Sequence, residues 1–97
     1  MEPRKNSKLI KVLAEISDSP GQFIRTLCCI KDLSSAKLAK LLGTSEAYII
    51  MVWNNKSGLG SKATIKFANA LSIDPYLLGR LVSDYNIEQC LKEPTEN

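Results

Sequence analysis

Two short helical patterns in the middle of the chain are separated by only a few residues, and this close spacing most restricts the fold. Leu38 and Leu42 fall on one face of a first helix, and Ile49 and Val52 fall on one face of a second. Gly43 lies between the two patterns, where a left-handed turn costs glycine little. The sequence therefore predicts two packed helices joined by a tight turn.

Helical spacing and helix-start signals continue on both sides of this pair. Residues 7–17 read as an amphipathic helix, and Ser19-Pro20 with Gln22 forms a capping box that starts the next one. Ser34-Ser35 and Ser45 cap the two central helices, and Asp74-Pro75 starts the last. The helices carry apolar residues at helical spacing: Leu9, Val12, Leu13 and Ile16, then Phe23, Ile24, Leu27 and Ile30, and later Ile65, Ala68 and Leu71. In the third helix we expect Leu38, Leu41 and Leu42 to face inward. No stretch alternates with period two, so we expect an all-α fold of five to six helices.

Composition excludes several classes of protein. The 97 residues suit one domain, and the absence of histidine removes the commonest general base and most transition-metal sites. The three cysteines include the adjacent pair Cys28-Cys29 and form no CxxC motif, so we expect no disulfide framework, no zinc and at least one core cysteine. No apolar run is long enough to span a membrane, and the start lacks a signal-peptide pattern. We expect a cytoplasmic protein that is not an enzyme and binds no cofactor or metal.

The net charge of +3 is unevenly distributed. Residues 20–67 hold seven basic and two acidic side chains, whereas residues 68–97 hold two basic and five acidic ones. A basic middle followed by an acidic tail favours a polyanion-binding module, although lysines that merely solvate helix faces produce the same asymmetry.

The central helix pair has the spacing of a helix-turn-helix, in which the second helix enters the major groove of DNA. Ala39 is small enough to let a second helix cross closely. A tight helical hairpin in a bundle is the structural alternative.

The sequence also resembles a known family, the Cro/cI-type (Xre) helix-turn-helix domain, whose fold is lambda-repressor-like. The motif reads Leu33-Ser34-x-x-x-Leu38-Ala39-x-x-Leu42-Gly43-x-Ser45-x-x-x-Ile49, and continues through Asn54-x-Lys56 to Ala68-x-x-Leu71-x-x-Asp74-Pro75. A narrower resemblance is to HigA/VapI-type antitoxins. It rests on Ser19-Pro20-Gly21-Gln22, on Gly58-Leu59 and on Leu81-x-x-Asp84-Tyr85-Asn86-Ile87. The alignment needs no gap from Ser19 to Ile87.

This resemblance implies a domain organisation and a set of partners. It places a helix-turn-helix domain at residues 19–82, preceded by an additional N-terminal helix or arm at 1–18 and followed by a short helix and acidic tail at 83–97. It implies a homodimer that binds an operator palindrome in double-stranded DNA, represses its own operon and binds a small toxin. The chain departs from the family at Ser35, where a phosphate-gripping glutamine is usual.

Candidate site residues follow from helix position and from the resemblance. The residues expected to contact bases are Glu46, Ala47, Ile50 and Met51, with Trp53 nearby. Those expected to contact phosphates are Ser35, Lys37, Ser45, Asn54 and Lys56. Those expected at a dimer or partner interface are Tyr76, Leu77, Leu81 and Tyr85 near the C-terminal helix, or Leu9, Leu13 and Ile16 near the N-terminus.

Three functions remain open from the sequence. The first is an antitoxin-like, sequence-specific repressor, and the second is a plain Cro-like regulator without a toxin. The third is a protein-binding module, a small inhibitor or adaptor, because apolar Ala47, Ile50 and Met51 also suit a protein partner.

Overall fold

The computed structural model describes residues 8–92 of the chain, and these residues form six α-helices and no strand. The helices are α1 (Lys8–Ile16), α2 (Pro20–Ile30), α3 (Ser35–Leu42), α4 (Glu46–Trp53), α5 (Ser61–Leu71) and α6 (Pro75–Lys92). The expectation of an all-α fold is confirmed over this part of the chain. None of these helices combines the length and apolar character that crossing a bilayer requires. Residues 1–7 of the expected arm and 93–97 of the expected acidic tail lie outside the described residues.

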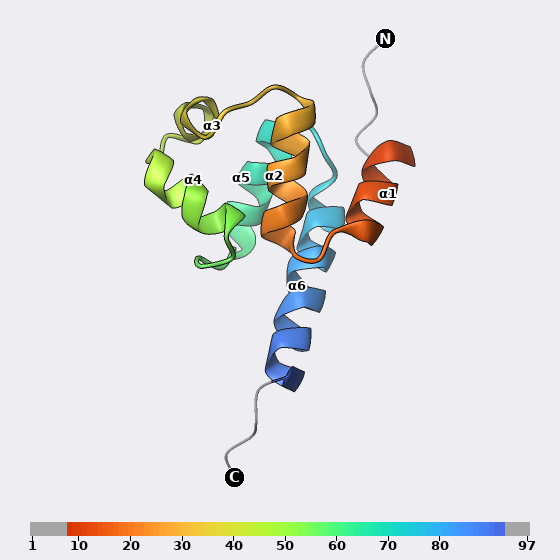
Figure 1. The fold of residues 1–97 in the computed structure, drawn as a ribbon. Helices are drawn as coiled ribbons and strands as arrows, with labels where there is room; N and C mark the ends of the chain where they lie inside the picture. The colour runs from red at the N-terminus through yellow and green to blue at the C-terminus, as the bar shows by residue number, and fades with distance from the viewer. Residues whose placement is uncertain (1–7, 93–97) are drawn as a thin grey trace.

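Helix α2 lies at the centre of the fold (Figure 1). It contacts α4 on one side and α6 on another, while α3 packs on α4 and α5, and α5 pairs with α6. The largest fully buried side chains are Phe23, Phe67, Ile24, Leu27, Leu38, Ile49, Leu71, Ile73 and Leu78. Because these residues come from α2 to α6 and the connection between α5 and α6, one apolar core holds these five helices together.

Serine side chains cap three of the helices. The side-chain oxygens of Ser19, Ser34 and Ser45 each accept a hydrogen bond at 3.1 Å from the backbone N–H three residues later. The predicted capping box differs in one detail, because the Gln22 side chain accepts from the backbone N–H of Asp18, at 2.5 Å, and not from that of the cap residue. The helix starts at Pro20, Ser35 and Glu46 are thus fixed by local hydrogen bonds.

Left-handed residues end two of the helices and shape the loop after α4. Gly43 ends α3 with φ 66°, as the sequence predicts, and Ser72 ends α5 with φ 59°. Asn55 also adopts a left-handed conformation, with φ 59°, in the loop after α4. Asparagine tolerates this geometry better than most residues, which is why it serves here in place of glycine.

The loop after α4 is tied to the start of α2 by the Asn55 side chain. Its Oδ1 atom accepts from the backbone N–H of Gly21 at 3.0 Å, and its Nδ2 atom donates to Oγ of Ser19 at 2.7 Å. The backbones are in very close contact, because a Cβ atom on Gly21 would lie 2.4 Å from the carbonyl oxygen of Val52. Only glycine permits this approach of α2 to the end of α4.

Cys28 and Trp53 meet further along the same contact between α2 and α4. Burial raises the pKa of the Cys28 thiol to about 11; Trp53 offsets part of this rise and Cys29 adds to it. Cys28 is therefore a neutral core residue, as expected, while Cys29 is exposed. The Arg25 guanidinium lies over the Trp53 ring, 5.8 Å from its centroid, in a cation–π contact.

One apolar residue that the sequence places inward, Leu41, is exposed, and this prediction is wrong. In α1 the buried residues are Ile10, Leu13 and Ala14. Other members of the predicted apolar stripes also face solvent, namely Leu9, Val12, Ile16, Ile30 and Ile65. These helices carry apolar residues on more than one face, so spacing alone does not decide which face the core covers.

The predicted division between residues 82 and 83 falls inside a single helix. α6 starts after Asp74, whose side chain accepts from the backbone N–H of Tyr76 at 3.0 Å, and it continues without a break to Lys92. Its buried residues are Leu78 and Val82, and beyond them it projects from the rest of the molecule (Figure 1). The last helix is thus half in the core and half outside it.

The close contact at Gly21 predicts a specific stability effect. Gly21→Ala should lower the free energy of unfolding by about 1–3 kcal/mol, because its Cβ meets backbone oxygens that cannot move independently of α4. Gly79→Ala in α6 is the matched control, since the nearest atom there lies at 3.9 Å, and it should raise stability by about 0.5–1 kcal/mol. Chemical denaturation followed by circular dichroism measures both. Equal stability of the two variants would contradict the contact.

Candidate functional site

Helix α4 is held in place from both ends and from one side. Ser45 caps its N-terminus, and the Asn55 hydrogen bonds hold the loop that follows its C-terminus. Ile49 and Val52 are buried against the core, and the tilted ring of Tyr48 lies 6.3 Å from that of Phe67. The side of α4 that carries none of these contacts is therefore a fixed surface.

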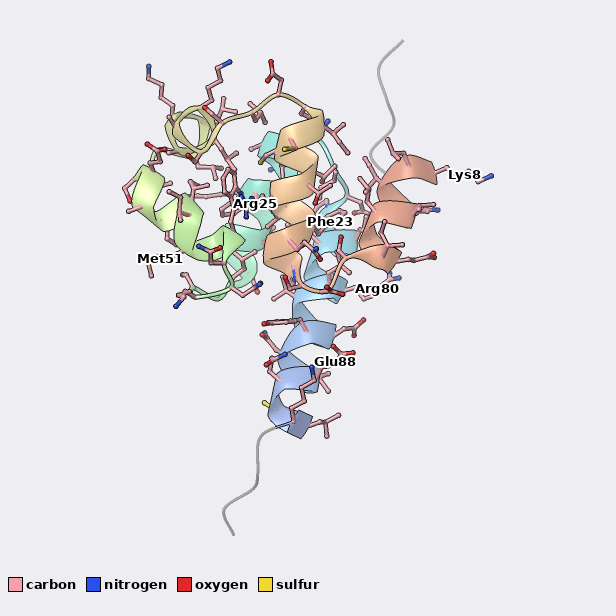
Figure 2. All side chains as sticks on the ribbon, in the orientation of Figure 1. Lys8, Phe23, Arg25, Met51, Arg80 and Glu88 are labelled. Atoms are coloured by element: carbon pink, nitrogen blue, oxygen red, sulfur yellow. The ribbon has the colours of Figure 1, made fainter. Side chains whose placement is uncertain are left out.

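That surface, here called the α4 face, consists of Glu46, Ala47, Ile50 and Met51. All four are exposed, which is the placement that their spacing predicts. Ile50 is 42% and Met51 45% exposed, and Met51 points away from the body of the molecule (Figure 2). Large apolar side chains on a rigid, protruding helix are uncommon without a partner to contact.

Glu46 is hydrogen-bonded to another predicted site residue. The Ser35 hydroxyl donates to Oε2 of Glu46 at 2.5 Å, which joins the first turn of α3 to the first turn of α4. The prediction that Ser35 shares in capping α3 is wrong, because Ser34 is the cap and Ser35 is the first helical residue. The bond orients the Glu46 carboxylate through Oε2 and leaves acceptor capacity on the carboxylate for a further contact.

The candidate phosphate contacts are brought together only in part. Lys37, Ser45, Asn54 and Lys56 are exposed, whereas Ser35 is half-buried and bound to Glu46. The backbone N–H groups of Asn54 and Lys56 donate to Ile50 and Met51, so their side chains are the groups free for a ligand. The first-turn amides at Glu46 and Ala47 have no acceptor within the helix.

Two lysines that are not among the predicted phosphate contacts lie beside this surface. Lys62 and Lys66 line a groove of about 350 Å³ between α5 and the start of α4, together with Thr44 and Tyr48. Both lysines are exposed, and neither forms an ion pair within residues 8–92. Their spacing of four residues places them on one face of α5, and this spacing is the sequence signal that identifies them.

The candidate interface residues divide into three groups. Leu13 belongs to the core of the chain itself. Leu77 and Leu81 are partly buried against that core, and Tyr85 is also partly buried. The interface candidates with large exposed surfaces are Leu9, Ile16 and Tyr76.

Nothing in the described part of the chain groups three His, Cys, Asp or Glu side chains where they could hold a metal ion. Comparison with models of known families and with curated proteins finds no match for this chain. Function has to be inferred from the α4 face and its surroundings.

The Ser35–Glu46 hydrogen bond can be measured by a double-mutant cycle. Ser35→Ala and Glu46→Ala should each cost less than about 1 kcal/mol, since both groups are near solvent. The double variant should be more stable than the sum of the two losses predicts, by about 0.5 kcal/mol or more. Denaturant unfolding of the four chains gives this coupling free energy, and a value of zero would show that the two side chains do not interact.

Proposed function

We propose that this chain is a sequence-specific DNA-binding protein of the Cro/cI helix-turn-helix class, with α4 as the helix that reads bases. The observation that carries the proposal is the α4 face, a fixed and exposed surface on the second of two helices joined by the turn 43–45. The major groove of B-DNA is about 12 Å wide and accepts one helix. Apolar Ala47 and Ile50 suit thymine methyl groups, and Glu46 suits the amino group of cytosine.

The charged and polar groups around α4 support contacts to phosphates on both sides of the groove. The N-terminal turns of α3 and α4 lie together, and Lys37 stands at the first of them. Asn54 and Lys56 follow the C-terminal end of α4, and Lys62 and Lys66 line the neighbouring groove. Amides at helix starts and lysine side chains bind phosphates without regard to sequence. They position the helix, and the α4 face supplies the specificity.

The resemblance to HigA/VapI-type antitoxins extends the proposal to an operon-repressing homodimer with a toxin partner. A two-fold dimer matches a palindromic operator, because each copy covers one half-site. The candidate dimer residues for this role are Tyr76, Leu77, Leu81 and Tyr85 on α6, or the exposed Leu9 and Ile16 on α1. A neighbouring small gene for a basic, ribonuclease-like protein would distinguish an antitoxin from a plain Cro-like regulator.

One observation favours a second candidate, a protein-binding module on the same frame. The α4 face carries a carboxylate and two large apolar side chains, and no arginine or glutamine for the commonest base contacts. Met and Ile side chains that protrude from a rigid helix also fit an apolar groove on another protein.

Salt dependence tests the phosphate contacts. The logarithm of the DNA affinity should fall linearly with the logarithm of salt concentration, with a slope of about −0.9 per neutralised phosphate. Lys56→Ala should weaken binding to all duplexes about equally and flatten the slope by about one unit. Lys92→Ala, at the far end of α6, is the control and should change neither quantity. Fluorescence anisotropy over a salt series measures both, and an unchanged slope for Lys56→Ala would exclude this contact.

Ile50→Lys separates the two candidate functions. In a DNA-reading protein it should remove a preference of roughly ten- to a hundred-fold for the best sequence and raise non-specific affinity, because the new cation attracts phosphate. In a protein-binding module it should abolish the partner complex instead. Ile30→Lys, at an isoleucine on α2 that is also exposed, is the matched control. The measurements are binding to specific and random duplexes and retention of co-purifying proteins. The proposal would be refuted if the wild-type chain binds no DNA and the Ile50→Lys variant loses a protein that co-purifies with the wild-type chain.

A further inference from the structure

Helix α1 carries a second apolar face that no part of the described structure covers. Its inner side buries Ile10, Leu13 and Ala14. Leu9, Val12 and Ile16, here called the outer stripe, are 57%, 44% and 68% exposed. Since these three residues repeat at three- and four-residue spacing, they form one continuous row along the helix. Three large aliphatic side chains on a nine-residue helix are a marked concentration of exposed apolar surface.

The charges of α1 run in the opposite direction to its helix dipole. Lys8 and Lys11 lie in the N-terminal half, where the dipole is positive, and Glu15 lies in the last turn, where it is negative. None of the three forms an ion pair within residues 8–92, and Asp18 follows just after the helix. This order is unfavourable for α1 alone, but it is complementary to a second α1 in the reverse direction.

We propose that a second copy of this chain docks on the outer stripe, with the two α1 helices antiparallel. The pairing places Leu9 against Ile16 of the second copy and the two Val12 side chains close to the two-fold axis. In this antiparallel pair the two-fold axis is perpendicular to both helices, so equivalent flanks of the two helices lie on the same side of the interface. Lys8 of one copy therefore lies beside Glu15 of the second copy. Each positive N-terminus then meets the negative C-terminus of the other helix.

The same features favour the antiparallel pairing and indicate the strength of the association. A parallel two-fold pair would place the Lys8 and Glu15 flanks of the two helices on opposite sides of the interface, without these charge contacts, and would align the two helix dipoles, which is unfavourable. One nine-residue helix offers much less than the ~800 Å² per partner of a stable dimer. We therefore expect a dissociation constant of roughly tens to hundreds of micromolar for two free chains.

This contact is separate from DNA binding. α2 lies between α1 and α4 (Figure 1), and Lys8 and Met51 point away from the molecule on opposite sides (Figure 2). Docking on α1 therefore leaves the α4 face of both copies uncovered. The inference does not depend on the proposed function, and it can be tested in the absence of DNA.

A charge swap tests the antiparallel arrangement. Sedimentation equilibrium of the full chain, from about 10 to about 500 µM, should show self-association. Lys8→Glu and Glu15→Lys should each weaken it by about three- to thirty-fold, because each creates two like-charge contacts across the axis. The double variant should restore the wild-type constant to within about two-fold. Circular dichroism checks that all variants are folded. If they are folded and the double variant does not restore association, the antiparallel arrangement is wrong.

Matched leucine variants test the location. Leu9→Glu should abolish this association step, whereas Leu91→Glu, at an exposed leucine on the projecting end of α6, should leave it unchanged. The opposite result would place self-association on α6 and refute the proposal. A chain that stays monomeric over the whole concentration range would also refute it.

Cysteine cross-linking gives the direction of the pairing independently. In a Cys29→Ser, Cys90→Ser background, mild copper-phenanthroline oxidation should join Leu9→Cys chains to Ile16→Cys chains. Neither variant alone should form a disulfide-linked dimer, because its cysteines lie at opposite ends of the paired helices. Efficient cross-linking of Leu9→Cys to itself would indicate the parallel arrangement and contradict the proposal.

Discussion

The contact between the first turn of α2 and the loop after α4 fixes the position of the α4 face. Gly21 allows the two backbones to touch, and Asn55 adds hydrogen bonds to Gly21 and Ser19 across the contact. Asn55 reaches both groups because its own backbone is left-handed, with φ 59°. One side chain thus closes the loop after α4 and joins it to Gly21 in α2, 34 residues earlier in the chain. The orientation of α4 depends on this contact.

A fixed α4 matters because recognition by a helix requires its exposed side chains to be held in position before the ligand arrives. The Ser45 cap and the buried Ile49 set the rotation of α4 about its own axis, and the Ser35–Glu46 hydrogen bond ties its first turn to α3. Ordering these groups in advance reduces the entropy lost on binding. The resulting surface is apolar and carries one carboxylate. Such a surface suits a protein partner as well as DNA, so both are candidate ligands of α4.

Local signals in the sequence predicted the helix starts and the tight turn, because serine caps and Gly43 act through neighbouring backbone atoms. Burial was predicted less well. Leu9, Leu41 and Ile65 lie at helical spacing but face solvent, since the choice of buried face depends on where other helices pack. The exposed positions on α4 were correctly placed, but the Ser35–Glu46 bond and the Asn55 side-chain contacts were not foreseen. They join residues distant in sequence, and no local pattern encodes them.

The central claim, that α4 reads DNA sequence, is tested most directly by selecting duplexes from a random library with the full-length wild-type chain. The account predicts that successive rounds enrich a palindromic motif with two half-sites about one helical turn apart. It also predicts that thymine-rich positions in each half-site face the apolar residues of α4. Retention of duplexes without any enriched motif, or no retention at low salt, would contradict the claim and favour a protein as the ligand of the α4 face.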